Sequence, residues 1–189
     1  MRWPSDKNLK KINWALYGVI VCSGVYLIIA PFLPQITFKI SNIVDMPSKT
    51  INTQKIDRNT NQLYIPSVKL TKPILDGDSP KTVNRGIWRV PTGSSPARES
   101  NTVLVGHRFS YKNPSVFYHL DKVEHGDTIY VSWNKKIYVY KVDQIRTVTP
   151  DTTSVEDPSD EPKLTIYTCT PLWSTSHRLV IQSKLDKVL

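Results

Sequence analysis

The feature that most constrains the fold is a series of short runs rich in β-branched and aromatic residues, which starts near Gln62. Turn-forming residues separate these runs, as in a chain of consecutive strands. The runs are Leu63–Leu70, Thr102–Val105, Thr128–Trp133, Lys136–Asp143, Lys163–Thr168 and Arg178–Lys184. Many short strands over about 125 residues predict an all-β domain, either a closed or nearly closed β-barrel or, as the alternative, a β-sandwich.

Local turn signals refine this expectation. The Asn-Lys pair at 134–135 predicts a tight turn, and therefore a hairpin between the runs on either side of it. Pro66 interrupts Leu63–Leu70, which predicts either an edge strand or a pair of strands. Long amphipathic helices are not indicated, and Ser115–Lys122 predicts only one or two short helical turns.

A second constraint is the run Trp14–Pro34, which contains no charged residue and is about long enough to cross a bilayer as a helix. Basic residues crowd its N-terminal side, so the positive-inside bias places the N-terminus in the cytoplasm and the rest of the chain outside. We therefore expect a cytoplasmic N-terminus (1–11), a single-pass anchor in the plasma membrane (12–35), an extracytoplasmic linker (36–61) and the β-barrel (62–189). A cleaved signal peptide is the alternative for the apolar run.

Composition excludes a disordered chain, because the hydrophobic fraction is 39% and the charged fraction 22%. The formal net charge is +9. A basic surface favours anionic surroundings such as lipid head groups, cell-wall polymers or nucleic acid, and a solvated surface without a specific partner is an equal alternative. We expect the membrane, and no nucleic acid, as a partner.

The chain has two cysteines, and they lie in different regions. Cys22 falls inside the apolar run, so Cys169 is the single thiol of the expected β-domain. A disulfide between them would draw Cys169 into the membrane, and no His/Cys spacing indicates zinc. An acidic stretch over 156–161 matches no calcium loop and reads as a solvated loop. No metal and no cofactor are expected.

Side-chain alternation places two polar residues on the same side of the expected sheet. Within Lys163–Cys169 the aliphatic side chains point one way and Cys169 points the other. Within Arg178–Gln182 the aliphatic side chains likewise point away from Arg178. If the aliphatic residues face the core, Cys169 and Arg178 both lie on the outer face at strand ends, where a groove could hold an extended peptide.

Three segments together carry a family resemblance: VLVGHRF at 103–109, TIYTCTP at 165–171 and SHRLVIQSKL at 176–185. A Thr-Cys pair that ends a strand, an Arg that starts the next strand and a Gly-His pair upstream resemble the sortase family. The resemblance covers about residues 62 to 186 and is greatest for class E, with class D second. It implies an eight-stranded closed β-barrel with short helical turns and the activity of an extracytoplasmic cysteine transpeptidase.

The resemblance assigns Cys169 as the nucleophile, His107 as its acid partner and Arg178 as the stabiliser of the oxyanion. These residue types suit the roles, because a thiolate attacks carbonyls, an imidazolium protonates a leaving amine and a guanidinium carries a planar fork of donors. Arg108 is the competing cation, but neighbouring residues on an extended segment point in opposite directions, which favours Arg178. The remaining histidines are expected to be structural or solvated: His119, His125 and His177.

Contacts to substrate are expected from Thr168, which precedes the nucleophile, and from the loop aromatics Tyr111, Trp88 and Trp173. Each aromatic could instead pack the ends of the barrel. The family resemblance implies a C-terminal sorting signal of the Leu-Pro-x-Thr-Gly or Leu-Ala-x-Thr-Gly kind, carried by secreted proteins. The likeness to class E implies the Leu-Ala-x-Thr-Gly form.

The expected function is cleavage of that signal between Thr and Gly, formation of a thioacyl enzyme at Cys169 and transfer of the protein to a cell-wall amine, in a peptidoglycan precursor. One alternative is a pilin-polymerising sortase that uses a Lys amine of a pilin. A generic cysteine protease is another, since water can replace the amine. From a different class comes a non-catalytic, membrane-tethered barrel that binds peptide or polyanion.

Overall fold

The computed structural model describes residues 6–30, 56–96, 98 and 100–189. The chain divides into two compact units, an N-terminal helix and a β-barrel. Helix α1 (Asp6–Ile29) starts within the predicted cytoplasmic segment, and its apolar side chains from Trp14 to Ile29 are exposed.

A membrane-spanning helix is not found in the described part of the chain, since no helix there is both long enough and apolar enough to cross a bilayer. The predicted span 12–35 continues past α1 into residues 31–35, which lie outside the described residues. The same holds for residues 36–55 of the predicted linker.

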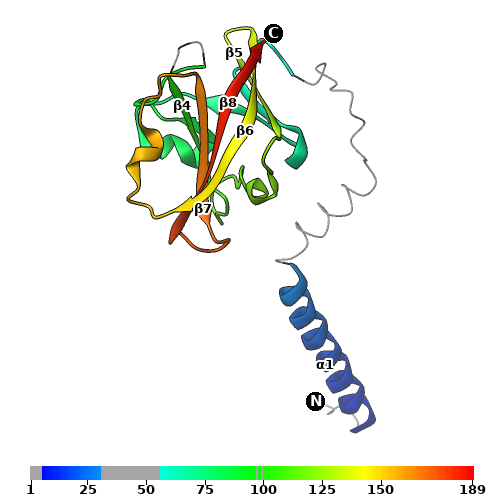
Figure 1. The fold of residues 1–189 in the computed structure, drawn as a ribbon. Coiled ribbons are helices and arrows are strands. Elements are labelled where there is room, and N and C mark those ends of the chain that lie inside the picture. The colour runs from blue at the N-terminus through cyan, green and yellow to red at the C-terminus, as the bar shows by residue number, and fades with distance from the viewer. Residues whose placement is uncertain (1–5, 31–55, 97, 99) are drawn as a thin grey trace. The chain divides into compact units, whose positions relative to one another are not determined.

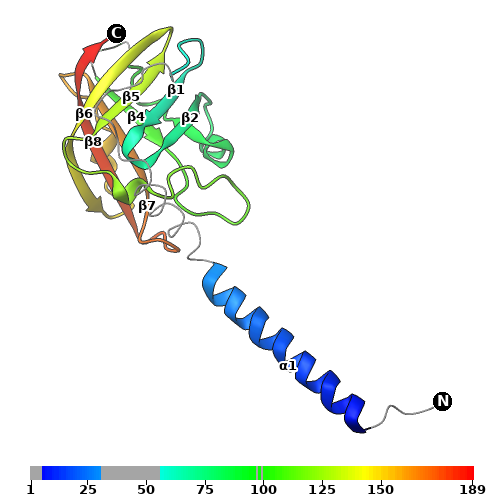
Figure 2. The same cartoon turned by 90° about the vertical axis from the view of Figure 1, so that its right-hand side faces the viewer.

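Within residues 56–189, apart from 97 and 99, eight strands form a closed barrel in the order β1-β2-β3-β4-β7-β8-β6-β5. The strands are β1 (Gln62–Ile65), β2 (Leu70–Leu75), β3 (Ile87–Arg89), β4 (Asn101–Val105), β5 (Thr128–Trp133), β6 (Lys136–Val148), β7 (Lys163–Thr170) and β8 (His177–Val188). β8 lies between β7 and β6 (Figure 1), and β1 lies between β2 and β5 (Figure 2). The pairing of β1 with β5 closes the sheet, which confirms the barrel and excludes the sandwich.

The predicted hairpin at 134–135 joins β5 to β6. Asn134 and Lys135 both have positive φ, of 50° and 65°, which matches the mirror-image turn that the twist of a hairpin favours. β6 runs on to Val148, so its predicted end at Asp143 was wrong. Register shifts between Val142 and Gln144 interrupt the alternation there, and most residues that follow are exposed.

Pro66 does separate two strands, but the second strand lies almost wholly beyond the predicted run, because β2 shares only Leu70 with Leu63–Leu70. Pro66 begins the short 3₁₀ helix η3 (Pro66–Val68), after which Lys69 takes a φ of 51° and the chain returns as β2. The prediction of six strand segments missed β3, because three residues are too short to show alternation. The other 3₁₀ helices of the described chain are η4 (Pro80–Arg85), η5 (Leu120–Lys122) and η6 (Thr153–Glu156).

The barrel interior holds the aliphatic residues that the alternation pattern placed there. Leu164 and Ile166 of β7 and Ile181 of β8 are fully buried. Each such burial contributes about 1.5–3 kcal/mol. The opposite face of the same two strands carries Cys169 and Arg178, which are partly exposed.

Ile56 lies in the segment that was expected to be linker, but it packs on the barrel. It is buried in a cluster with Tyr130, Ile137 and Val139. Asp57 then accepts a hydrogen bond from the hydroxyl of Thr60, which forms a turn that leads into β1. Residues 56–61 are thus part of the packed unit, because their one large apolar side chain is covered by β5 and β6.

Candidate active site

Two parallel strands bring the Gly-His and Thr-Cys segments to one edge of the barrel. β4 and β7 pair in parallel, with Val105 opposite Tyr167. His107 and Cys169 each follow this pair by two positions, so both lie near the same end of the barrel, Cys169 still within β7. The antiparallel pairing of β7 with β8 sets Arg178 directly opposite Cys169. Strand register alone therefore gathers residues from three distant parts of the chain.

His107, Cys169 and Arg178 line one open cleft with a volume of about 300 Å³. Its remaining walls come from η4, β3, the ends of β4, β6 and β7, and the loop that contains η6. They consist of Pro80, Val83, Trp88, Val105, Gly106, Val148, Pro150, Thr152, Thr153, Val155, Glu156, Tyr167 and Thr168. The structure thus brings together all three residues that the sequence nominated for chemistry.

The loop that carries His107 is held against β7 by close contacts. The hydroxyl of Thr168 donates a hydrogen bond of 2.8 Å to the carbonyl oxygen of Gly106, and Thr168 is buried. A Cβ at Gly106 would lie 2.6 Å from Val116 and 2.7 Å from Phe117, which no ordinary packing allows. The Gly before the histidine therefore serves close packing.

The imidazole of His107 is partly buried in the cleft and reaches across it to η4. The ring Nε2 lies 2.9 Å from Oδ1 of Asn84. The backbone carbonyl oxygen of His107 accepts a hydrogen bond from the backbone N–H of Phe117. Burial lowers the pKa of His107 below its ordinary value, because desolvation penalises the cation. The neutral imidazole is thus the favoured form near neutral pH.

Arg178 opens β8 and presents its guanidinium at the cleft wall. Its Nη1 donates to the carbonyl oxygens of Thr175 and His177, at 2.9 Å and 3.1 Å. An arginine has five N–H donors in a planar fork, so the Nε and Nη2 hydrogens can be offered to a bound carbonyl.

Arg108 performs a different task from Arg178. It is buried, its Nη1 donates to Thr170 Oγ1 at 2.9 Å, and its Nη2 pairs with Asp121 at 3.0 Å. It is not among the residues that line the cleft. Its side chain joins the His107 loop to the end of β7 and to η5.

The sortase domain family matches residues 63–186, which is most of the barrel. The chain belongs to the sortase family. Sortase SrtE1 of Streptomyces coelicolor is 32% identical over 139 residues, which cover 65% of this chain and 39% of that protein. The chain spans 39% to 58% of the length of the three curated sortases that it matches.

Solved sortase structures share the barrel. Sortase E1 from Streptomyces coelicolor, with a tripeptide in its active site, superposes with a TM-score of 0.60 at 27% identity, over 68% of this chain and 88% of that one. A pilus-related sortase C of Group B Streptococcus gives a TM-score of 0.62 at 27% identity, over 70% of each chain. These likenesses agree with the eight-stranded barrel described above.

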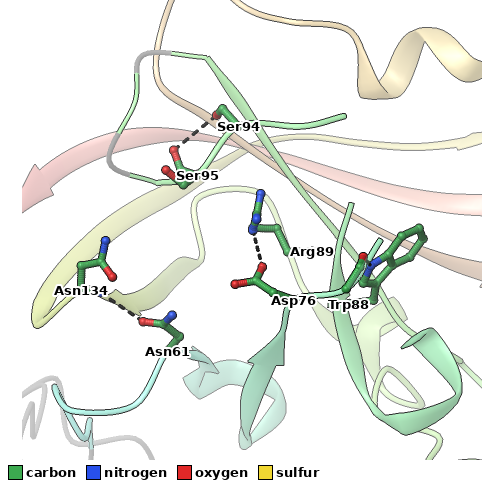
Figure 3. Close-up of polar contacts among 8 residues, drawn as sticks. Asn61, Asp76, Trp88, Arg89, Ser94, Ser95 and Asn134 are labelled. Atoms are coloured by element: carbon green, nitrogen blue, oxygen red, sulfur yellow. Dashed lines mark hydrogen bonds and ion pairs between the residues drawn. The ribbon is translucent and has the colours of Figure 1, made fainter. Parts of the chain in front are cut away.

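The four residues nominated for substrate contact take two kinds of position in this sortase barrel. Thr168 and Trp88 line the cleft. The indole N–H of Trp88 donates to Gly77 O at 2.8 Å, and beside it Arg89 pairs with Asp76 at 2.6 Å (Figure 3). These bonds hold the strand that forms one wall of the cleft.

Tyr111 and Trp173 do not line the cleft. With Phe109 they form an aromatic cluster on the loops that follow β4 and β7, with ring centroids 4.8 Å and 4.0 Å from Phe109. Tyr111 is 90% exposed and Trp173 is 53% exposed, so a substrate that extends beyond the cleft could reach both.

The acidic stretch that was expected to be a solvated loop contributes one residue to the cleft. The phenol of Tyr167 donates a hydrogen bond of 2.5 Å to Glu156. Burial and then this bond raise the pKa of Tyr167 above its ordinary value. Across the described residues, no group of three or more His, Cys, Asp or Glu side chains is placed to hold a metal ion.

Sequence reasoning missed Asn84 and Tyr167 as parts of the site. The contact of Asn84 with His107 joins the short 3₁₀ helix η4 to the loop after β4, 23 positions apart, and no periodic pattern indicates such a contact. The position of Tyr167 was readable, since it shares the face of Cys169, but nothing in its residue type marked it as functional. The other three histidines, which were expected to be structural or solvated, do not line the cleft.

Proposed function

We propose that the chain is a cell-surface cysteine transpeptidase that cleaves a sorting signal of the Leu-Pro-x-Thr-Gly or Leu-Ala-x-Thr-Gly kind between Thr and Gly. The observation that carries this proposal is the convergence of His107, Cys169 and Arg178 on one open cleft. Membership of the sortase family supports the same chemistry.

In the first step the thiolate of Cys169 attacks the carbonyl carbon of the Thr residue, and a tetrahedral intermediate forms. Arg178 donates hydrogen bonds to the oxyanion, where charge develops. The C–N bond then breaks, and the imidazolium of His107, which carries the proton taken from the Cys169 thiol, gives that proton to the leaving Gly amine. A thioester remains on Cys169, and the Gly-containing peptide leaves.

In the second step a neutral amine attacks the thioester. His107, now neutral, accepts the proton of that amine, and the Cys169 sulfur leaves as a thiolate as the new amide bond forms. Burial favours the neutral imidazole that this step needs. If water replaces the amine, the outcome is hydrolysis.

The cleft walls suit an extended peptide with an apolar residue upstream of the cleaved bond. Val83, Trp88, Val105 and Val155 supply apolar surface, as expected of a site that holds a leucine side chain. We therefore assign Trp88 and the cleft side of Thr168 to the bound signal. Tyr111 and Trp173 are assigned to substrate parts that extend outside the cleft.

The acceptor is proposed to be an amine of a peptidoglycan precursor. The barrel is as similar to a pilus-related sortase C as to sortase E1, so a Lys amine of a pilin is the second candidate. The product separates the two, since a cell-wall acceptor gives single anchored proteins and a pilin acceptor gives a covalent ladder.

The two cysteines provide a matched test. The full chain, kept in detergent, is incubated with signal peptides and an amine acceptor, and mass spectrometry follows the Cys169 thioester and the ligated product. Cys169→Ala is expected to lose both, whereas Cys22→Ala, in α1, should retain wild-type rates. Undiminished turnover by Cys169→Ala would contradict the mechanism and leave a binding barrel or another nucleophile.

We also propose that the uncharged run Trp14–Pro34 anchors the chain in the plasma membrane with the barrel outside. The support is the absence of charge over this run and the four basic residues before it. An anchor of this kind would hold the cleft near secreted substrates as they leave the membrane.

A further inference from the structure

We propose that the outer face of β6, β8 and β7 binds a linear phosphate polymer along a row of three lysines, Lys141, Lys184 and Lys163, called here the lysine row. The proposal goes beyond the transpeptidase function and does not depend on it. The three strands lie side by side in the barrel (Figure 1). Lys163 precedes Cys169 by six positions of β7, so the row lies about 20 Å along the strand from the nucleophile.

Positive charge is concentrated on these three strands. β6, β7 and β8 carry seven Lys and Arg residues against two Asp residues, whereas the rest of residues 56–189 carries eleven basic against twelve acidic residues. The positive excess of the barrel therefore comes entirely from three neighbouring strands. Solubility would be served by any distribution of these charges, so their concentration on one side favours an interaction with an anionic partner.

The register of the sheet places the three lysines directly beside one another. Lys184 of β8 is paired with Lys141 of β6 on one side and with Lys163 of β7 on the other. Paired residues on neighbouring strands point to the same face of a sheet. Leu164, the next residue of β7, is fully buried in the barrel, so the lysine row points outward. Neighbouring strands are about 4.8 Å apart, and the row therefore extends across about 10 Å.

Three like charges in one row repel one another, because like charges directly opposite on neighbouring strands are destabilising. The barrel neutralises this row only in part. A carboxylate oxygen of Asp143 lies 3.5 Å from Lys184 Nζ in an exposed ion pair. Lys141 Nζ donates a hydrogen bond of 2.6 Å to the hydroxyl of Thr128, which carries no charge.

The third lysine of the row shows the crowding of charge directly. Burial and then the nearby Arg146 lower the pKa of Lys163, while Asp143 and Asp157 act in the opposite direction. A partner that brings several negative charges at once would relieve the repulsion among these cations. The lysine row thus suits a multivalent anion better than a single small one.

The surroundings of the row favour a soluble polymer over a membrane or a nucleic acid. The next outward row consists of Thr165, Gln182 and Gln144, and neither row contains an aromatic or aliphatic side chain. A surface that enters a bilayer interface carries such side chains among its basic residues, and single-stranded nucleic acid is held by stacking of bases on aromatic rings. A phosphate polymer needs only cations placed to meet several phosphates at once.

The first test reads the lysines of the full chain, kept in detergent, one by one. Inorganic polyphosphate is the probe, and mass spectrometry measures how fast a reagent that acylates lysine modifies each side chain. Polyphosphate at about ten times its dissociation constant is expected to slow modification of the lysine row about tenfold. Lys72 and Lys122, exposed on other elements, should react as before. Equal protection of all exposed lysines, or protection of none, would overturn the proposal.

The second test compares two variants that lose the same charge. One replaces the lysine row by glutamine, and the other replaces three exposed lysines elsewhere in the barrel, namely Lys72→Gln, Lys81→Gln and Lys122→Gln. The first is expected to bind polyphosphate about tenfold or more weakly. It should also lower the slope of log affinity against log salt by about two, because a single-stranded polymer releases about 0.7 counterions per phosphate contact.

The variant with the three replacements elsewhere should keep the wild-type affinity to within about twofold, since distant exposed charges are screened. Equal losses in the two variants would show that only net charge matters, which would overturn the assignment to the lysine row. Should the lysine-row variant fail to fold, by circular dichroism, protection in the wild-type chain still decides the proposal.

Three further probes decide the chemistry of the partner. Inorganic phosphate, at the same phosphate concentration as the polymer, should protect no lysine. Single-stranded DNA with the same number of phosphates should bind no more tightly than polyphosphate. Bilayer discs that contain anionic lipid, with no polymer added, should leave the lysine row reactive in the full chain. Tighter binding of DNA, or protection by phosphate or lipid alone, would overturn the phosphate polymer as the partner.

Discussion

At the scale of single residues, the site depends on a division of labour between two arginines. Arg108 is buried and bonded to two other segments, whereas Arg178 reaches the cleft and keeps donors for a ligand. Only the second arrangement suits a group that must meet charge which appears during the reaction, because Arg108 is buried and does not line the cleft.

Arg178 is therefore expected to matter in the transition state more than in folding. Arg178→Ala should lower kcat/KM by about 100- to 1000-fold, and Arg178→Lys should recover only part of this loss because lysine keeps the charge without the fork. Rates of thioester formation, with circular dichroism as a check on folding, provide the measurement. Lys187→Ala, also on β8 and exposed, is the control. Near-normal rates in Arg178→Ala would remove this residue from the mechanism.

At the scale of elements, Arg108 fastens three segments that meet beside the cleft. Its ion-pair partner Asp121 lies on η5, and its hydrogen-bond partner Thr170 ends β7 directly after Cys169. The guanidinium is nearly covered and the carboxylate is about one-third exposed. Screening by water is thus weaker here than at a surface ion pair, which makes loss of one partner costly.

Removal of the carboxylate charge tests this connection. Asp121→Asn is expected to lower the free energy of unfolding by about 1–3 kcal/mol, since a covered cation then lacks its counter-charge. Asp143→Asn breaks the exposed ion pair with Lys184 and should change the free energy of unfolding by less than about 1 kcal/mol. Denaturant titrations of both variants give the comparison. If both variants lower the free energy of unfolding equally, the burial of Arg108 does not strengthen its pair with Asp121.

The elements that could be predicted from the sequence are those with clear turn residues or side-chain alternation. β5 was predicted at its true bounds because a turn signal precedes it and a left-handed turn follows it. The faces of β7 and β8 were readable from alternation, which is why Cys169 and Arg178 were expected on one face. β3 was missed because it is short. Asn84 was missed because its contact with His107 joins a short 3₁₀ helix to a loop, and no sequence pattern indicates such a contact.

At the scale of the whole molecule, the proposed anchor makes a prediction about where the chain resides. Ile20→Lys places a charge in the middle of the uncharged run and should reduce membrane retention, because a central lysine costs about 2.5–3.5 kcal/mol on insertion. Ile20→Leu should be retained like the wild type. Carbonate extraction of membranes from expressing cells measures the difference. A wild-type chain found only in the soluble fraction would contradict the anchor.

The parallel pairing of β4 with β7 also governs when the protein becomes able to react. Thr168 bonds to Gly106 across 62 positions of chain, so the two halves of the cleft meet only after all the intervening residues have been made. Contacts this distant in sequence form late and slowly compared with local ones. A chain made from its N-terminus therefore contains His107 before Cys169 exists, and under the mechanism proposed above no thioester can form until synthesis has passed Cys169.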